Sequence, residues 1–188
     1  MDEARTGQDA HRRSKRRLSP ISRIPGYGVR MCHYCGCREI PLIREFIAEH
    51  ESVTDTAGNA LRALDHGDRE LAGELVARMG LELHAHWQGE EDGLFAVMGG
   101  DAEYADHIGA LVREHRELAV FLGRVDLGRA EDVVQLREAV DELHRHIAKE
   151  EDGLFPASLT ALSGEEWDRS MAAWRSAHPE APGNLGRP

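Results

Sequence analysis

Two copies of one short motif carry the residues of this chain that are best suited to chemistry. His86 and Glu90 are four residues apart, and so are His146 and Glu150. On a helix this spacing places both side chains on one face, with their roots about 5–6 Å apart. An imidazole and a carboxylate at that distance can bind one metal ion or two neighbouring ions. Metal binding is therefore the first chemistry that the sequence suggests.

The motif belongs to a longer internal repeat. Residues 83–95 and 143–155 are identical at most positions, and both copies end in Glu-Glu-Asp-Gly-Leu-Phe. A weaker upstream echo pairs Glu49-His50 with Glu114-His115. Each half of the chain therefore contains a single histidine followed, one helix later, by His-x-x-x-Glu. The repeat predicts two helical hairpins of common origin.

The elements that must position these residues are helices. Apolar residues recur at spacings of three and four, which is the period of an amphipathic helix. The pattern predicts four long helices, over about residues 40–65, 68–98, 102–126 and 130–160. Short connections favour antiparallel neighbours. We therefore predict an all-α fold, an up-down antiparallel four-helix bundle with a short fifth C-terminal helix and disordered tails.

Local signals set the expected helix ends. Gly67 follows the first segment, and Asp101 is the expected N-cap of the third. Ser163 with Glu166 three residues later has the pattern of a capping box, and this predicts a fifth helix that ends near His178. We expect a disordered basic leader, a cysteine-rich segment, the bundle, the C-terminal helix and a disordered tail, at residues 1–30, 31–39, 40–162, 163–178 and 179–188.

Four histidines and two glutamates lie on the apolar faces of the predicted helices, at matching depths. They are His50, His86, Glu90, His115, His146 and Glu150. Burying an unpaired charged group costs several kcal/mol, whereas a whole domain is stable by only about 5–15 kcal/mol. A metal pair removes this cost by turning the six groups into ligands. Imidazole and carboxylate together suit iron, manganese or zinc better than calcium or magnesium.

The bland alternative is a helical bundle that binds no metal and acts as an interaction protein. A single buried histidine is usually a hydrogen-bonded core residue, but six such groups in a duplicated motif favour metal. Other polar residues near the motif are predicted to face solvent, namely His84, His107 and His144. The acids that follow each motif also favour a solvated face over a role in supporting the ligands, namely Glu91, Asp92, Glu151 and Asp152.

Three cysteines lie within six positions, at Cys32, Cys35 and Cys37. With His33 they can hold zinc or iron, or they can act as reactive thiols. A short cluster of cysteines without either role remains an equal alternative. An odd number of closely spaced cysteines is a poor basis for a disulfide framework, so we expect reduced thiols and a cytoplasmic protein.

Composition narrows the class further. The chain has 188 residues, of which 41% are hydrophobic and 5% aromatic, and its formal net charge is −11. No apolar stretch is long enough for a membrane span, and no secretory signal is recognisable. Residues 1–30 are basic and the rest is acidic, so the bundle should repel nucleic acid. The leader is predicted to be disordered, although it can contact nucleic acid or acidic surfaces, and Met31 is a possible second start.

The double His-x-x-x-Glu followed by Leu-Phe, with two single upstream histidines, resembles the hemerythrin-like, HHE cation-binding family over roughly residues 39–160. The resemblance implies a non-haem di-iron site in a four-helix bundle. Glu90 and Glu150 would bridge the two irons, and the four histidines would be terminal ligands. The segment from Met31 is similar to small actinobacterial hemerythrin-like proteins that begin Met-Cys-x-Tyr-Cys-Gly-Cys.

The sequence departs from the oxygen-carrying members at two positions. Ala119 stands where the third helix of those proteins carries a histidine, and Glu151 stands where they carry an aspartate. The set of four histidines and two glutamates is more similar to the di-iron proteins of iron–sulfur repair and the nitric oxide response. We therefore expect a cytoplasmic di-iron protein that handles NO, O2 or peroxide in stress defence or iron–sulfur repair. The alternative is a non-catalytic module that binds or senses O2 or iron, and oligomerisation stays open.

Overall fold

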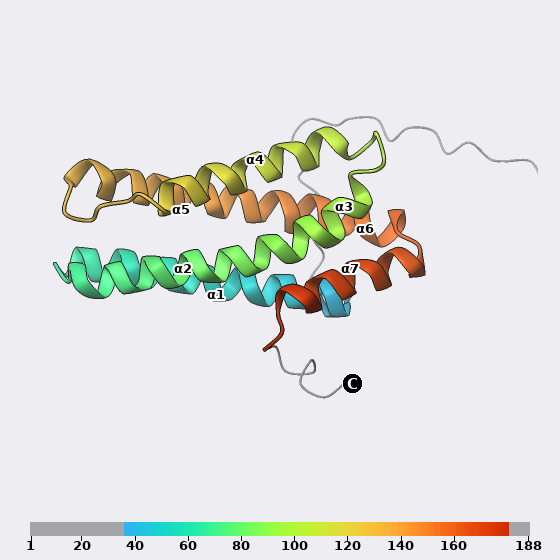
Figure 1. The fold of residues 1–188 in the computed structure, drawn as a ribbon, viewed down its shortest axis with the longest axis horizontal. Helices are drawn as coiled ribbons and strands as arrows, with labels where there is room; N and C mark the ends of the chain where they lie inside the picture. Colours follow the sequence, from blue (N-terminus) through green and yellow to red (C-terminus); the bar gives the residue numbers. More distant parts are fainter. Residues whose placement is uncertain (1–35, 181–188) are drawn as a thin grey trace, which may run out of the picture.

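The computed structural model describes residues 36–180, which form helices joined by short connections and contain no β-strand (Figure 1). A single short turn, η1 (Cys37–Glu39), precedes the first helix. The α-helices are α1 (Pro41–Asp65), α2 (Arg69–Gly89), α3 (Phe95–Met98), α4 (Ala105–Leu122), α5 (Ala130–Lys149), α6 (Phe155–Ala161) and α7 (Gly164–Ala177). The predicted all-α bundle with a short C-terminal helix is confirmed.

Two of the four long rods contain a π-helical turn. The turn η2 (Glu90–Leu94) joins α2 to α3, and η3 (Glu150–Leu154) joins α5 to α6. Both have the sequence Glu-Glu-Asp-Gly-Leu, and both begin at the glutamate of the motif. α1, the rod α2–η2–α3, α4 and the rod α5–η3–α6 run up and down in turn (Figure 1). Periodicity alone predicted uninterrupted helices here.

The core consists of two apolar clusters that lie on either side of the polar motif along the bundle. One cluster is built around Phe46, Leu94 and Phe155. The other is built around Val53, Met79 and Leu136, at the end where α1 meets α2. Burial of apolar surface is the main favourable term in folding. The motif residues are thus held in a layer that apolar packing closes from above and below.

Helix ends follow the expected signals in two cases and differ in a third. Gly67 has φ 79° after α1, a conformation that glycine adopts without steric cost. Ser163 and Glu166 form the predicted capping box of α7. The expected N-cap at Asp101 is wrong, because α4 begins later, after Tyr104. The Asp101 carboxylate instead accepts from the Glu103 amide at 2.9 Å, which closes a turn before the helix.

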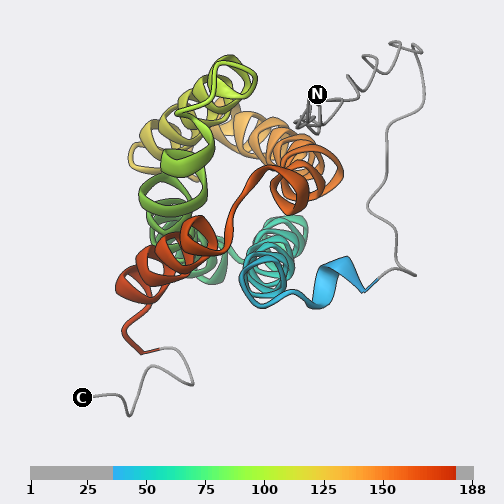
Figure 2. The ribbon, with the colours of Figure 1, turned by 90° about the vertical axis from the view of Figure 1, so that its right-hand side faces the viewer.

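Helix α7 lies outside the ring of four rods and packs on α2 and η2 (Figure 2). Two glycines allow this close approach. A Cβ on Gly93 would lie 3.0 Å from the Ser170 carbonyl oxygen, and one on Gly89 would lie 3.2 Å from the Trp174 ring. Trp174 is buried in the contact. α7 is therefore a fifth element packed directly against the segment that carries the motif.

Some of the predictions concern residues outside the range 36–180, and the structure does not test them. The basic leader at residues 1–30, Cys32, Cys35 and the end of the tail lie outside the described residues. Cys37 is the first residue of η1 and is half-buried. Over residues 36–180, no helix combines the length and the apolar character that crossing a bilayer requires.

Candidate metal centre

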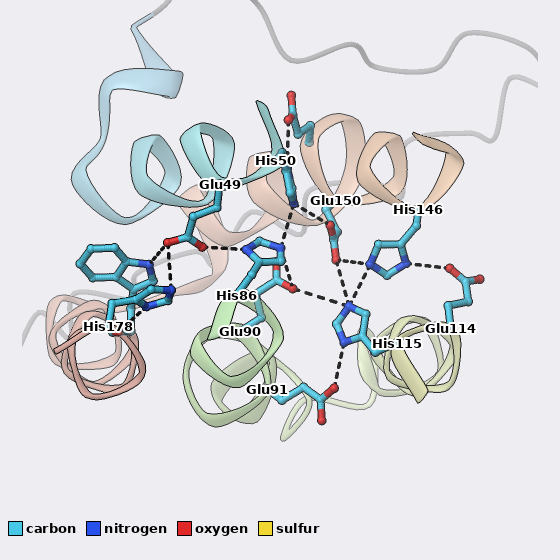
Figure 3. Close-up of polar contacts among 12 residues, drawn as sticks. Glu49, His50, His86, Glu90, Glu91, Glu114, His115, His146, Glu150 and His178 are labelled. Carbon is cyan, nitrogen blue, oxygen red and sulfur yellow. Dashed lines mark hydrogen bonds and ion pairs between the residues drawn. The ribbon is translucent and has the colours of Figure 1, made fainter. Parts of the chain in front are cut away.

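The structure brings the six motif residues together in the middle of the bundle (Figure 3). Each of the four long rods contributes one histidine, and η2 and η3 contribute the glutamates. All six are buried, and both glutamates are completely inaccessible. Their potential ligand atoms form two groups, and Glu150 belongs to both. The groups are His50, His86, Glu90 and Glu150, and His115, His146 and Glu150.

Each carboxylate contacts imidazoles from both halves of the chain. Glu90 Oε2 lies 3.4 Å from His86 Nε2 and 3.6 Å from His115 Nε2. Glu150 lies 3.2 Å from His50 Nε2 and 2.9 Å from His146 Nε2. The two glutamates therefore stand between the two histidine pairs, as groups that bridge two adjacent cations would.

The Nε2 atoms within each pair point at each other. His50 Nε2 and His86 Nε2 are 3.1 Å apart, and His115 Nε2 and His146 Nε2 are 2.9 Å apart. A neutral imidazole that carries its hydrogen on Nδ1 presents a lone pair at Nε2. Two facing lone pairs repel unless positive charge lies between or beside them, and either a proton or a metal cation can supply it.

A glutamate fixes the outer nitrogen of every histidine in the centre. Each Nδ1 donates to a carboxylate oxygen at 2.7–3.0 Å. Because a carboxylate accepts, the hydrogen sits on Nδ1 and Nε2 faces inward. The pairs are His50 with Glu151, His86 with Glu49, His115 with Glu91, and His146 with Glu114.

The prediction that Glu91 and Glu151 belong to a solvated face is therefore wrong. Both are only partly exposed and hold a histidine on a neighbouring rod. The π-helical turn supplies the reason, because it holds more residues per turn than an α-helix. Consecutive glutamates are then separated by a smaller rotation, so one faces the centre and the next reaches across to the adjacent rod. Asp92 is exposed and Asp152 is half-buried.

Two supporting acids, Glu49 and Glu114, were not singled out by the sequence analysis. Each immediately precedes a single histidine, but each supports the histidine of the motif in its own half. The signal was present in the upstream echo, where both histidines follow a glutamate. By contrast, His84, His107 and His144 are exposed, as predicted.

Aromatic rings fix the faces of the two single histidines. His50 stacks on Phe155, with centroids 5.9 Å apart and an interplanar angle of 7°. His115 stacks on Phe95 at 5.7 Å and on Trp87 at 4.8 Å. The two phenylalanines occupy the same position in the repeat. Hydrogen bonds and stacking together leave these imidazoles little freedom to turn.

The electrostatics show strong competition for positive charge. Burial lowers the pKa of His50, but Glu150 and Glu151 outweigh it and raise that pKa to about 9. Burial lowers the pKa of His86 to about 4, against the opposing effect of Glu49. Burial and the neighbouring Glu150 raise the pKa of Glu90, whereas the surrounding imidazoles outweigh burial and lower the pKa of Glu150. The raised pKa of His50 and the lowered pKa of Glu150 both show that the buried carboxylates favour positive charge beside them.

The donor set fits a metal pair. None of the four oxygens of Glu90 and Glu150 accepts a hydrogen bond of good geometry, although all are fully buried. Unpartnered buried carboxylate oxygens are unfavourable, and bound cations would satisfy them. Inward imidazole lone pairs held by outer carboxylates are typical of metal-binding histidines. These residues suit the binding of metal ions.

Fold and site thus define an all-α bundle with a buried centre for metal ions. The comparison with known families agrees, since the Hemerythrin HHE cation binding domain matches residues 42–158. The chain belongs to this family. No curated protein and no solved structure matches it. Helix α7, with Trp174 and His178, lies beyond the matched residues.

Proposed function

We propose that this chain is a non-haem di-iron protein whose centre binds or converts NO, O2 or peroxide in stress defence or iron–sulfur repair. The observation that carries the proposal is the pair of ligand groups that share the buried Glu150. One group is completed by two histidines of the first half, and the other by two histidines of the second. A shared carboxylate between two such groups supports two neighbouring ions rather than one.

The proposed division of ligands follows the contacts. His50 and His86 would hold one ion, His115 and His146 the other, and Glu90 and Glu150 would bridge. With two histidines and the bridging carboxylates for each ion, this set would leave room for a small molecule to bind. Iron bound by such ligands supplies redox chemistry with NO, O2 and peroxide that protein side chains lack. Manganese or zinc fits the same ligands and is the less favoured occupant in this proposal.

The contribution of the chain is to orient ligands and exclude water. Glu49, Glu91, Glu114 and Glu151 keep the four Nε2 atoms directed inward. The apolar clusters above and below limit solvent access, which strengthens electrostatic interactions and tunes the centre. The centre is therefore prepared for small reactants, such as diatomic molecules and peroxide, rather than large polar substrates.

Metal analysis and Mössbauer spectroscopy of anaerobically purified protein test the proposal. We expect about two irons per chain, as a bridged di-iron cluster requires, with optical and Mössbauer spectra that change on addition of NO. The variant His86→Ala should lose metal and stability, because the folded state is stabilised by the ions it binds. The matched control is His84→Ala, which removes an exposed imidazole two residues away.

The outcomes separate the rival functions. Reversible binding of NO or O2 without consumption would favour the binding or sensing module over an enzyme. A well-folded protein without metal, in which His86→Ala is neutral or stabilising, would favour the interaction bundle. The first result would contradict conversion but keep the metal centre, and the second would contradict the metal centre itself.

A further inference from the structure

A cavity of about 450 Å³ opens between α4 and α5 and reaches two histidines of the candidate metal centre. Two of its lining residues are the buried histidines of the second half, His115 and His146. Its walls include the rings of Trp87 and Phe121 and the side chain of Leu143. The cavity thus leads from a charged rim past apolar side chains to the two histidines of one half of the centre, and Glu90 and Glu150 are not among its lining residues.

The opposite side of the centre is closed by α7. The Trp174 indole nitrogen donates to Glu49 Oε1 at 2.6 Å, and His178 Nε2 lies 3.3 Å from the same oxygen. The other oxygen of Glu49 accepts from His86 (Figure 3). In the second half, Glu114 occupies the equivalent place and pairs with Lys149, whose side chain is 44% exposed. α4 and α5 also pack far less closely than α1 and α2.

The charge at the outer end of the cavity is mainly negative. Glu117, Glu138 and Glu142 are exposed lining residues, and Lys149 is already paired with Glu114. Arg145, the other lining cation, lies 3.7 Å from Glu142, so four lining glutamates face two lining cations. An excess of negative charge at the rim lowers the local concentration of anions, and the buried side chains of Trp87 and Leu143 solvate a charged molecule poorly. Small uncharged molecules meet neither barrier.

We propose that this cavity is the entrance to the centre, that it admits small uncharged molecules and disfavours anions, and that incoming molecules reach the His115–His146 half first. The inference rests on the proposed function, because it names the class of reactant for the same site. It assigns NO, O2 and neutral peroxide to this route, and it disfavours superoxide, nitrite and azide. The side closed by α7 is not a route.

Fluorine NMR of the full chain with 5-fluorotryptophan and diamagnetic zinc provides the test. Trp87 lines the cavity and Trp174 is on the buried face of α7, yet each has the same exposure of 8%. Dissolved O2 is uncharged and paramagnetic, so it enhances relaxation of the fluorine nuclei that it can approach. We expect the enhancement to be severalfold larger at Trp87 than at Trp174. Equal enhancement at the two residues would overturn the proposal.

Two variants check that the cavity is responsible. Ala139→Phe fills the lining, and it should reduce the enhancement at Trp87 toward the value at Trp174. Val120→Phe is the control, because Val120 is 66% exposed on α4 and does not line the cavity. If Ala139→Phe leaves the Trp87 effect unchanged, O2 reaches this ring by another path and the entrance is wrong.

To test whether the cavity disfavours anions, the probes must differ in charge but not in shape. A neutral hydroxyl nitroxide and an anionic carboxyl nitroxide differ in charge at nearly equal size. We expect the neutral probe to enhance fluorine relaxation more than the anionic probe does, and we expect the ratio of the two enhancements to be larger at Trp87 than at Trp174. The double variant Glu117→Gln, Glu142→Gln should bring the ratio at Trp87 closer to the ratio at Trp174. Equal preference at both rings would overturn the selectivity. Zinc content of the same samples reports on the metal centre separately, so a metal-loaded chain without preferential access contradicts the entrance alone.

Discussion

The two halves of the bundle share an inner design and differ in what surrounds it. In each half, a motif histidine is held by the glutamate that precedes the single histidine of that half. Each single histidine is held by the second glutamate of the opposite motif and stacks on the phenylalanine at the end of that motif. The centre is therefore a two-fold arrangement in which each half supports the other.

The two halves differ in the groups that contact the outer glutamates, Glu49 and Glu114. Glu49 is held by Trp174 of α7 and by His178, the residue that follows this helix, whereas Glu114 is held by Lys149 at the surface. The two copies of the repeat differ at the residue concerned, because Gly89 stands at the position that Lys149 occupies in the second copy. A side chain at Gly89 would meet the Trp174 ring. The absence of a side chain at Gly89 thus leaves room for α7, whose Trp174 supports Glu49 as Lys149 supports Glu114.

The residues nearest the proposed ions are therefore the same in the two halves, whereas the groups that support Glu49 and Glu114 differ. Identical inner residues require the same distances and the same orientation of Nε2 in both halves. The outer support needs only a donor to a carboxylate, and an ammonium or an indole provides one. The second half, which has Lys149 at the surface, borders the cavity, whereas α7 covers the first half.

The largest effect should come from removing the shared carboxylate. Glu150 belongs to both ligand groups, whereas Glu90 belongs only to the group of His50 and His86. We expect Glu150→Gln to lose metal from both halves, and Glu90→Gln to retain more metal in the second half. Metal content per folded chain, measured after identical loading, compares the two variants. Equal losses would show that the glutamates bridge equivalently and that the halves differ only outside the centre.

The next effect concerns the outer acids. Glu49→Ala and Glu114→Ala each remove the acceptor of a motif histidine, and loss of such a support costs about 10–100-fold in metal affinity. Only Glu49→Ala also removes the acceptor of Trp174, so only this variant should speed hydrogen exchange of α7 amides. Chelator competition and hydrogen exchange measure the two effects.

A control separates orientation of the histidine from docking of α7. Trp174→Phe keeps Glu49 and His86 but removes the indole donor. It should loosen α7 while costing less metal affinity than Glu49→Ala. If Glu114→Ala loosened α7 as much as Glu49→Ala does, the proposed asymmetry between the halves would be wrong.

The sequence was sufficient for the rods and for the six inner residues, because both depend on local periodicity. An imidazole such as His115 on an apolar face is visible from its neighbours three and four residues away. The π-helical turns were not predictable in this way, because a five-residue segment such as Glu90–Leu94 has no period of its own. This is why the positions of Glu91 and Glu151 were predicted incorrectly.

The contacts between α7 and Glu49 could not be predicted from the sequence for a different reason. The hydrogen bond from Trp174 to Glu49 joins residues 125 positions apart. Its existence depends on how α7 docks, and only the capping box of that helix is local. The exchange of lysine for glycine between the two copies was the available signal, but its meaning depends on knowing that Trp174 lies there.

A matched pair of glycines should give a smaller effect. Gly153→Ala meets no atom within 4 Å, and replacing a helical glycine stabilises by about 0.5–1 kcal/mol. Gly93→Ala places a Cβ 3.0 Å from the Ser170 carbonyl oxygen and 3.2 Å from the Ala173 Cβ. Overpacking of this kind costs about 1–3 kcal/mol, so we expect net destabilisation and loosening of α7. Denaturant unfolding of both variants decides the sign, and stabilisation by Gly93→Ala would mean that α7 yields easily.

The smallest effect should appear in the pH dependence of α7 itself. Hydrogen bonds from Ser163 lower the pKa of Glu166 below its usual value of 4.5. A carboxyl group with a lowered pKa in the folded state contributes stability that is fully present above pH 4.5, and this contribution is lost as the pH falls through the lowered pKa. The variant Glu166→Gln keeps an acceptor for the capping box but cannot ionise. We therefore expect the wild-type chain to be slightly more stable than Glu166→Gln near neutral pH, with the two converging as Glu166 becomes protonated. Free energies of unfolding measured across this range check the prediction, and a difference that stays constant with pH would show that the charge of Glu166 does not stabilise α7.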